Sequence, residues 1–428
     1  MSEHEKQSIG VLTSGGDCPG LNAVIRGVVG GSERLGYGVV GFEDGFEGLV
    51  DPVRCRPLAS DGMRGILQQG GTILGATNKG RFAALTGENT RVNLEPKLLL
   101  GVQDTCRQYN LKGLVCVGGD GSMAVAEQFA EVGIPVVGVP KTIDNDLSST
   151  AFTFGFDSAV ACATDAIDRL HTTAASHGRI MILEVMGRHA GWIALHAGIA
   201  GGADVILLPE MTWSYESLCS HIRRRRAAGL KSSIVVVAEG ARLPSGEEIT
   251  LERRAEDRQV RLGGIGATLS VELQKRLPLE TRSTALGHLQ RGGTPSAFDR
   301  FLATQFGAHA VRLVHQESFG QMVTYQPPEF GSCPISESIG CLNKVDPNSS
   351  VVDAARGLGI SFGDGENCGR LFEPTDGKRV KGENSLAGTE QAPALSPAVG
   401  LLADPAMGLP AIGVPETGVP EMGVPVGG

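Results

Sequence analysis

Short apolar segments alternate with longer segments of mixed polarity through most of the 428-residue chain. Seven of the apolar segments are rich in β-branched residues and lack polar alternation, a pattern typical of strands covered on both faces. The segments between them have the spacing of helices. This alternation predicts an α/β fold with mostly parallel sheets. The predicted strands are residues 8–14, 36–44, 113–119, 135–140, 179–185, 204–209 and 233–240.

Ligands of open parallel sheets bind beyond the carboxyl ends of the strands, so the residues that follow each predicted strand are candidates for a site. The first strand is followed by "TSGGDCPGLNAVIRG", in which Gly15, Gly16 and Gly20 precede a helix predicted from about Leu21. Glycines permit tight turns, and a helix N-terminus binds anions. The segment matches neither G-x-G-x-x-G nor the P-loop pattern, so a simple turn stays an alternative.

A second glycine-rich segment, "GGDGSMAVAEQFA", follows the strand 113–119. Gly118, Gly119 and Gly121 surround Asp120, and Ser122 is predicted to cap the following helix. A carboxylate would repel a phosphate directly, so Asp120 is predicted to hold Mg²⁺ that bridges to phosphate oxygens. An aspartate that merely caps the helix is the alternative.

The segment "GVPKTIDNDL" places a lysine, a threonine and two aspartates directly behind a predicted strand. If it is extended, Thr142, Asp144 and Asp146 point to one face. Two close carboxylates raise each other's pKa unless Lys141 or a metal offsets their charge. Such a cluster suits proton abstraction from a substrate hydroxyl. A turn rich in Asp and Asn is the alternative.

Further polar side chains follow the later strands, and several of them are arginines. In a chain of net negative charge, a group of arginines near strand ends predicts a site for a phosphorylated, anionic substrate. The residues are Glu184, Met186, Arg188, His189, Glu239, Arg282, His288 and Arg291.

Composition narrows the class of protein. The formal charge of −9, from 38 basic and 47 acidic residues, argues against a nucleic-acid or anionic-membrane partner. The polar start of the chain, the lack of a long apolar segment and nine scattered cysteines favour a cytoplasmic protein with reduced thiols. Residues 365–428 are rich in Gly and Pro, end in a GVPET-like repeat and are predicted to be a disordered tail.

Five motifs occur in one order: "GVLTSGGDCPGLNAVIRGVV", "VGGDGSMAVA", "PKTIDND", "EVMGR" and "LGHLQRGGTPSAFDR". From about residue 8 to about 364, the chain resembles the 6-phosphofructokinase family. The resemblance implies two Rossmann-like lobes with the active site in the cleft between them. The phosphoryl-donor lobe would be about 1–155 plus 290–340, and the sugar-phosphate lobe about 156–289 plus 341–364.

The resemblance also implies roles for individual residues. Asp144 would be the base that takes the proton from the 1-hydroxyl of fructose 6-phosphate, with Thr142 and Arg188 as further catalytic residues. Asp120 would bind Mg²⁺. The ATP-binding residues would be Gly16, Lys79, Gly119, Asp120, Gly121, Ser122 and Lys141. The sugar phosphate would be bound by Thr142, Asp144, Asp146, Arg179, Met186, Gly187, Arg188, Glu239, Arg282, His288 and Arg291.

The same resemblance concerns assembly. Arg179 and Arg282 match family arginines that reach across a subunit interface into a neighbour's site. The implied protein is therefore a homo-oligomer, usually a tetramer, with a dimer as the other form.

The phosphoryl donor is the point on which the signature is mixed. Gly121 matches users of ATP, whereas Lys141 matches users of pyrophosphate. Asn78 stands where bacterial ATP enzymes carry a donor-binding arginine, so Lys79 or Arg81 would replace it. We predict ATP, because only a side chain at position 121 excludes the larger donor. A pyrophosphate-dependent fructose 6-phosphate 1-phosphotransferase is the alternative.

A regulatory or binding subunit that kept the fold and lost the chemistry is an alternative from a different class. Such a protein is expected to lack one of the central residues of the reaction. Asp120, Asp144 and Arg188 are all present. The enzyme is therefore the preferred interpretation.

Overall fold

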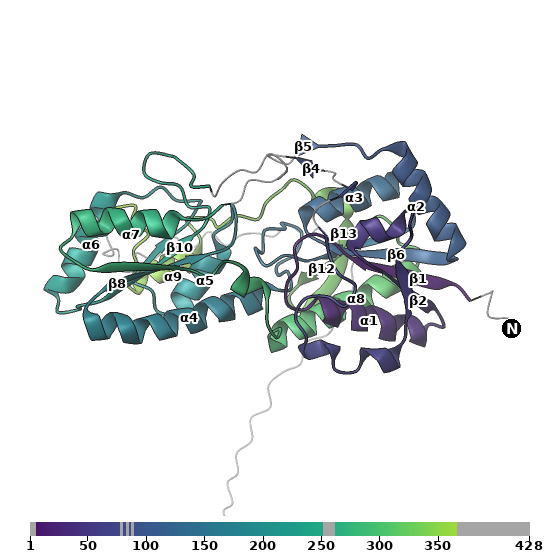
Figure 1. Ribbon diagram of the computed structural model, residues 1–428, viewed down its shortest axis with the longest axis horizontal. Coiled ribbons are helices and arrows are strands. Elements are labelled where there is room, and N and C mark those ends of the chain that lie inside the picture. Colours follow the sequence, from purple (N-terminus) through teal and green to yellow (C-terminus); the bar gives the residue numbers. More distant parts are fainter. Residues whose placement is uncertain (1–5, 78–79, 83–84, 87–89, 251–261, 366–428) are drawn as a thin grey trace, which may run out of the picture. The chain divides into compact units, whose positions relative to one another are not determined.

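The computed structural model describes residues 6–77, 80–82, 85–86, 90–250 and 262–365. Its strands form two larger sheets, one of seven strands and one of four (Figure 1). Each of the seven predicted strands is present, and the prediction of an α/β fold with mostly parallel sheets is confirmed. They are β1 (Ser8–Thr13), β2 (Gly38–Phe42), β6 (Leu111–Gly118), β7 (Val136–Pro140), β8 (Ile180–Val185), β9 (Val205–Leu207) and β10 (Ser233–Ala238).

The seven-stranded sheet has the order β13-β12-β7-β6-β1-β2-β3. Its five inner strands are parallel, and the two edge strands run antiparallel to their neighbours. The sequence pattern did not predict β3 (Cys55–Leu58), β12 (Gln321–Gln326) or β13 (Glu329–Pro334). The edge strands β3 and β13 are partly exposed, and β12 has three buried residues and ends in exposed Gln326, so none carries a long apolar run.

The four-stranded sheet has the order β11-β8-β10-β9, and its strands are all parallel. Its edge strand β11 (Thr281–Ala285) has the sequence TRSTA and is largely exposed, which explains why no apolar run predicted it. A short pair, β4 (Leu85–Thr86) and β5 (Thr90–Arg91), forms a separate ribbon.

Helices cover both faces of the seven-stranded sheet (Figure 1). Inward side chains alternate along its strands, as in Val115 and Val117 toward one core and Leu114 and Cys116 toward the other. The first core includes α1 (Leu21–Arg34) and α8 (Ala297–His315), and the second includes α2 (Pro96–Gln108) and α3 (Asp120–Glu131).

The four-stranded sheet is covered in the same way. Leu183 points to the core shared with α4 (Phe156–His177) and α5 (Trp192–Ala200), and Ile182 points to the core with α6 (Tyr215–Ala227) and α7 (Ile265–Arg276). The α4/α5 core is continuous with that of α1 and α8, and α9 (Ser350–Gly357) contributes Val352 to it. The remaining elements are short 3₁₀ helices: η1 (Gly45–Leu49), η2 (Ser60–Met63), η3 (Ile66–Gln68), η4 (Gly287–Arg291) and η5 (Ile335–Ser338).

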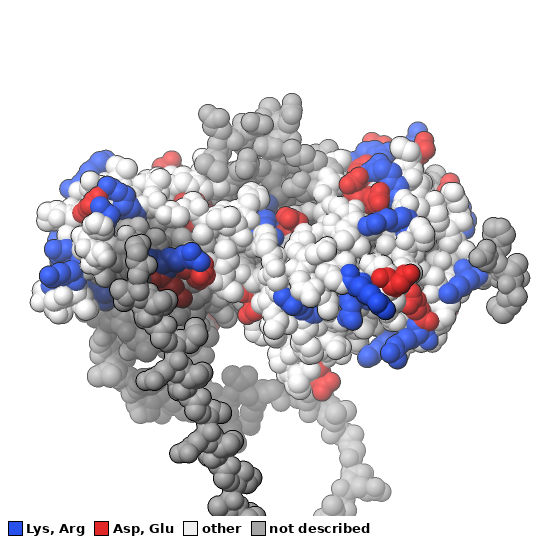
Figure 2. All heavy atoms as spheres, turned by 60° about the horizontal axis from the view of Figure 1, so that its bottom comes forward, with Lys and Arg blue, Asp and Glu red and all other residues white. Residues whose placement is uncertain are grey.

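On the face that Figure 2 shows, basic and acidic side chains are interspersed and often adjacent. Several of the chain's ion pairs are exposed ones of this kind, such as Arg169 with Asp165 at 2.8 Å. Within the described residues, no helix combines the length and apolar character that a membrane span requires. The predicted disordered tail lies, from residue 366 onward, outside the described residues.

Candidate active site

Strand order selects one edge of the seven-stranded sheet as the place for a site. β1 and β6 are neighbours, but the chain continues from β1 to β2 on one side and from β6 to β7 on the other, so the two connections run in opposite directions. Ligands of such sheets bind where the order reverses, beyond the carboxyl ends of the strands. The loops after β1 and β6 are the two glycine-rich segments.

The loop after β1 is a tight turn that ends at the N-terminus of α1. Gly15 and Gly20 have φ values of 78° and 108°, a region that favours glycine. Gly16 lies close to another side chain, since a Cβ there would lie 2.5 Å from Nη1 of Arg291, and the end of that side chain would have to shift. Arg291 donates through Nη1 to the carbonyl oxygen of Asp17 at 3.0 Å. Two predicted binding residues, Gly16 and Arg291, are thus in direct contact.

The loop after β6 leads into α3, which begins at Asp120 and has Gly119 as its N-cap. Ser122 was predicted to cap this helix, but it does not. It lies in the first turn, where its amide donates to the carbonyl oxygen of Gly119 at 2.9 Å. The prediction was wrong because the helix begins three residues earlier than a cap at Ser122 requires. A Cβ on Gly121 would have no atom within 4 Å, so this part of the loop is open.

Asp120 does not act as the helix cap either. Its Oδ1 accepts a hydrogen bond from the amide of Gly340 at 3.1 Å. Burial raises the pKa of the Asp120 carboxyl, so a nearby cation would favour its charged form. Among the described residues, no group of three or more acidic, histidine or cysteine side chains forms a complete metal site. The donor set suits Mg²⁺, which commonly takes one or two protein carboxylates and completes its shell with phosphate oxygens and water.

Residues 142–146 form a turn and not the extended segment that was predicted. The amide of Asp144 donates to Oγ1 of Thr142 at 3.1 Å, and Asn145 has a left-handed φ of 52°. Local side-chain hydrogen bonds of this kind favour turns over strands, which is the physical reason for the difference. The side chain of Asn145 holds the turn, because its Oδ1 accepts from the amide of Thr153 at 2.9 Å.

The carboxylate of Asp144 is the least satisfied polar group of this turn. Asp144 is 5 % exposed, and its Oδ1 is buried without a hydrogen-bond partner among the described residues. Burial and the charge of Asp144 raise the pKa of Asp146 to about 7. The same two causes raise the pKa of Glu239 to about 7. Three carboxyl groups from two different sheets therefore share one electrostatic environment.

The side chain of Lys141 is buried and bonded to the first glycine-rich loop. Its side chain is 4 % exposed, and its Nζ donates to the carbonyl oxygen of Gly16. Its amide donates to the carbonyl oxygen of Gly118 at 2.8 Å. Lys141 thus joins both glycine-rich loops, and burial lowers the pKa of its ammonium group.

The loop after β8 carries Met186, Gly187 and Arg188. Gly187 and Arg188 have left-handed φ values of 137° and 48°. The amide of Arg188 donates to Oε1 of Glu239 at 3.3 Å, and Arg188 lowers the pKa of both Glu239 and Asp146 against the larger effect of burial. This loop lies against Gly240, where any Cβ would collide with the carbonyl oxygen of Arg188. Sequence reasoning did not select Gly240, although it directly follows the candidate residue Glu239.

Helix η4 carries His288 and Arg291 of the predicted sugar-phosphate residues. His288 is exposed, and Arg291 is half-buried against the first glycine-rich loop. Between them, Gln290 is fully buried and accepts from the amide of Met186 at 2.8 Å through Oε1. Gln290 is a residue that the sequence reasoning missed, although it lies inside the "HLQRGG" motif.

Arg179 and Arg282 lie together, away from the carboxylates described above. Arg179 Nε pairs with Oε2 of Glu280 at 2.7 Å, and Arg282 pairs with Oε1 of the same side chain. Glu280 is a further residue that sequence reasoning did not select. Its carboxylate holds the two predicted intersubunit arginines side by side.

The remaining donor residues fall in the segment 75–82. Lys79 and Asn78 lie outside the described residues. Arg81 is exposed and pairs with Glu47 of η1 at 2.8 Å, so it is engaged at the surface.

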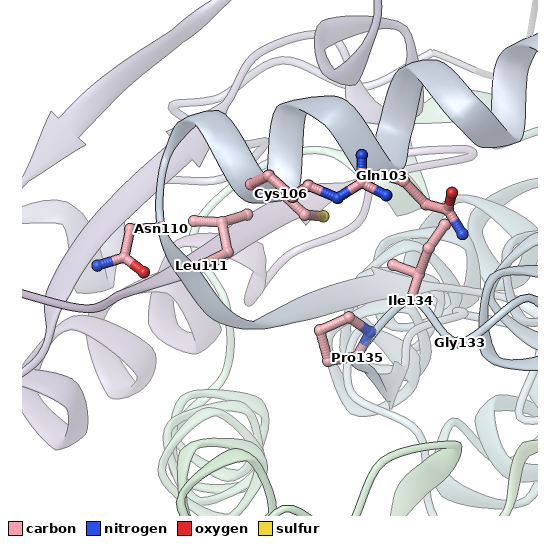
Figure 3. Close-up of a pocket in the computed structure, with 8 residues that line it drawn as sticks. Gln103, Cys106, Asn110, Leu111, Gly133, Ile134 and Pro135 are labelled. Carbon is pink, nitrogen blue, oxygen red and sulfur yellow. The ribbon is translucent and has the colours of Figure 1, made fainter.

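Figure 3 shows a pocket of about 320 Å³ lined by Gln103, Cys106, Ile134 and Pro135, among others. It lies at the amino ends of β6 and β7 and contains none of the candidate residues.

Comparison with known proteins gives a consistent result. The family profile described as "Phosphofructokinase" matches residues 8–314. "ATP-dependent 6-phosphofructokinase" of Chloroflexus aurantiacus is 49 % identical over 360 residues, which cover 84 % of this chain and 99 % of the relative. "Pyrophosphate--fructose 6-phosphate 1-phosphotransferase" of Streptomyces coelicolor is 49 % identical over 343 residues, which cover 79 % and 96 %.

Solved structures show the same fold. The Pichia pastoris phosphofructokinase in the T-state matches with a TM-score of 0.67 and 32 % identity, over 79 % of this chain. The match spans 38 % of that longer chain. A structure described as a pyrophosphate-dependent phosphofructokinase from Nitrosospira multiformis matches with a TM-score of 0.69 at 19 % identity, over 81 % of this chain and 88 % of that one, which shows the fold alone.

Proposed function

The chain belongs to the phosphofructokinase family, and we propose that it transfers the γ-phosphoryl group of ATP to the 1-hydroxyl of fructose 6-phosphate. The products are ADP and fructose 1,6-bisphosphate. The proposal rests on the family and on one observation at the site. That observation is the buried Oδ1 of Asp144, an anionic acceptor with no partner among the described residues.

Asp144 is proposed as the general base. A base must present an acceptor atom at hydrogen-bond distance from the proton that it takes. Oδ1 of Asp144 is such an acceptor atom. Thr142 holds the turn that carries Asp144, because its Oγ1 accepts from the Asp144 amide at 3.1 Å. Asp146 is proposed to contact the substrate next to this group. Its raised pKa indicates that a second charge beside Asp144 is unfavourable.

The donor phosphates are proposed to bind at the two glycine-rich loops. Gly16, Gly119, Gly121 and Ser122 form backbone surfaces at the N-termini of α1 and α3, where helix dipoles and amide groups favour anions. Asp120 would hold Mg²⁺, which neutralises phosphate charge when bound. Lys79 stays a predicted donor contact that lies outside the described residues.

The sugar phosphate is proposed to bind at the ends of the four-stranded sheet. Arg188 would stabilise charge on the transferring group, and Glu239 would accept hydrogen bonds from sugar hydroxyls. The backbone at Met186 and Gly187 would line the site. His288 and Arg291 of η4 complete the proposed set, and Arg291 already lies against the donor loop.

ATP is favoured over pyrophosphate by the space around position 121. No atom lies within 4 Å of a Cβ placed on Gly121, so the loop leaves room for the rest of a nucleotide. The ammonium group of Lys141, the residue that suggested pyrophosphate, donates a hydrogen bond to the Gly16 carbonyl oxygen. It therefore acts on the loop and not as a separate contact for a small donor.

Initial rates of fructose 1,6-bisphosphate formation test this proposal. The purified chain is supplied with Mg²⁺, fructose 6-phosphate and either ATP or pyrophosphate. We expect turnover with ATP and none with pyrophosphate, and we expect Gly121→Asp to abolish the use of ATP because its carboxylate would occupy the open space and repel phosphate. Turnover of the unsubstituted chain with pyrophosphate alone would contradict the proposed donor.

The protein is proposed to work as a cytoplasmic homotetramer or homodimer with small-molecule substrates only. Arg179 and Arg282 would then enter a neighbour's sugar-phosphate site. Their shared partner Glu280 supports this idea, because it keeps two cationic groups together at the surface of one subunit. Sedimentation velocity at increasing protein concentration measures the assembly.

A further inference from the structure

The connecting segment, residues 340–345, contacts Asp120, the turn that bears Asp144, and the start of α5. It follows η5 and precedes α9, and so leads from the seven-stranded sheet toward the elements of the four-stranded sheet. At its start, the amide of Gly340 donates to Asp120. At its end, the amide of Val345 donates to Oε1 of Glu210 at 2.9 Å. No motif of the sequence pointed to it.

Asn343 is the centre of this segment. Its amide donates to the carbonyl oxygen of Asp146 at 2.8 Å, and its Nδ2 donates to the carbonyl oxygen of Asn145 at 3.1 Å. The neighbouring Leu342 forms an isolated antiparallel bridge with Leu147. Asn343 therefore holds the turn that carries Asp144 through contacts separate from that of Thr153.

The turn contains a left-handed residue, Asn145. Asparagine tolerates a left-handed φ better than most residues with a side chain, and surrounding hydrogen bonds fix it in this conformation. At Asn145, whose φ is 52°, Thr153 holds the side chain and Asn343 holds the carbonyl oxygen. The loss of one of these contacts frees the neighbouring Asp144 to move.

The same asparagine is tied to the sugar-phosphate side. Its carbonyl oxygen accepts from Nε1 of Trp192, the first residue of α5, at 2.8 Å. Glu210 joins the end of the connecting segment to the same loop, since its Oε1 also accepts from the amide of Gly191 at 2.9 Å. The base-bearing turn and the loop that carries Arg188 are thus linked through two residues of one short segment.

We propose that Asn343 is a positioning residue, which holds the turn bearing Asp144 in register with the loop bearing Arg188. This inference rests on the proposed function for its catalytic consequence. Asn343 is not proposed to touch either substrate. Its role is to fix the separation between the base on one sheet and the substrate-binding groups on the other.

Asn343→Ala removes the side-chain hydrogen bond, and the neighbouring exposed Lys344→Ala is the matched control. We expect Asn343→Ala to lower kcat about tenfold, because small displacements of reacting groups are costly. The KM for ATP and the thermal midpoint should remain close to those of Lys344→Ala. Hydrogen exchange of the amides of residues 144–147 should be faster in Asn343→Ala alone.

Trp192→Phe tests the second connection, because it removes the Nε1 donor and keeps a smaller aromatic ring. We expect it to lower kcat less than Asn343→Ala, and we expect the double variant to lose less than the product of the two single losses, because both act on one linkage. A kcat of Asn343→Ala within twofold of the control, or multiplicative losses in the double variant, would overturn the proposal. If Asn343→Ala does not fold, the amide hydrogen exchange of residues 144–147 is measured in Trp192→Phe instead. Faster exchange than in the unsubstituted chain supports the linkage, and equally slow exchange refutes it.

The exchange experiment also separates this proposal from the proposed function. An unsubstituted chain that shows no activity with ATP would contradict the function. Faster exchange at residues 144–147 would then still support the positioning role of Asn343, and unchanged exchange would refute it.

Discussion

The carboxyl ends of the two sheets carry different kinds of groups. Beyond the seven-stranded sheet lie glycine-rich backbone, the N-termini of α1 and α3, and a lysine whose ammonium group is bonded within the chain. Beyond the four-stranded sheet lie long side chains, Arg188 and Glu239, on loops with left-handed residues. Backbone amides suit phosphate chains of any kind, whereas directed side chains suit one particular sugar.

The difference teaches where substitutions are tolerated. In the glycine-rich loops, the effect of a substitution depends on the free space around the new Cβ atom. Beyond the four-stranded sheet, the effect of a substitution depends on charge, because the charge of Asp144 raises the pKa values of neighbouring buried carboxyl groups. The three predictions that follow test this comparison.

Asp144→Asn is expected to have the largest effect. The amide keeps the size of the carboxylate but cannot take a proton, so kcat should fall about a thousandfold or more, while the KM for fructose 6-phosphate changes little. Initial rates at saturating ATP measure it. Asp165→Asn, on the exposed surface of α4, is the control and should retain full activity. A kcat of Asp144→Asn within tenfold of that control would remove Asp144 from the role of base.

Gly16→Ala and Gly121→Ala form a matched pair on the glycine side. The new methyl group at position 16 lies 2.5 Å from Nη1 of Arg291, whereas at position 121 it meets nothing within 4 Å. We expect Gly16→Ala to lower kcat/KM for ATP about tenfold, because Arg291 and the loop must move apart. Gly121→Ala should lower it less, because its methyl group meets no atom of the chain within 4 Å and is smaller than the carboxylate of Gly121→Asp. Equal effects of the two substitutions would show that local space does not govern these loops.

Glu239→Gln should have the smallest effect and act on the pH dependence of stability. The carboxyl faces Asp144, Arg188 and Glu184, and burial raises its pKa from 4.5 to about 7. Because the unfolded chain loses this proton at lower pH, the free energy of unfolding falls as pH rises from about 4.5 to about 7. Glu239→Gln removes this contribution, and the similarly raised pKa of Asp146 remains.

The thermal midpoint at pH 5 and pH 8 measures the change. This difference between the two pH values should be smaller in Glu239→Gln than in the unsubstituted chain, because one of several carboxyl groups with a raised pKa is removed. Asp104→Asn, on the exposed surface of α2, is the control and should leave the difference unchanged. A difference in Glu239→Gln as large as in this control would show that Glu239 does not titrate in this range.

The sequence pattern was sufficient wherever a local property decides the structure. The strands β1, β2, β6, β7, β8, β9 and β10 are apolar runs, and both glycine-rich loops follow strands as predicted. Three of the strands that it missed, β3, β11 and β13, lie at edges and are partly exposed. The turn at Thr142–Asp146 was mistaken for an extended segment, because side-chain hydrogen bonds outweighed the strand pattern.

The sequence by itself determined the α/β class, the family and the residues that follow each strand, because these depend on neighbouring positions and on motifs of short length. Only the tertiary structure decided which groups meet. Lys141 bonds to Gly16, Arg291 packs on the same loop, and Asn343 holds a turn about 200 residues earlier in the chain. Contacts over such distances depend on how strands and helices pack, and no local pattern of residues encodes that packing.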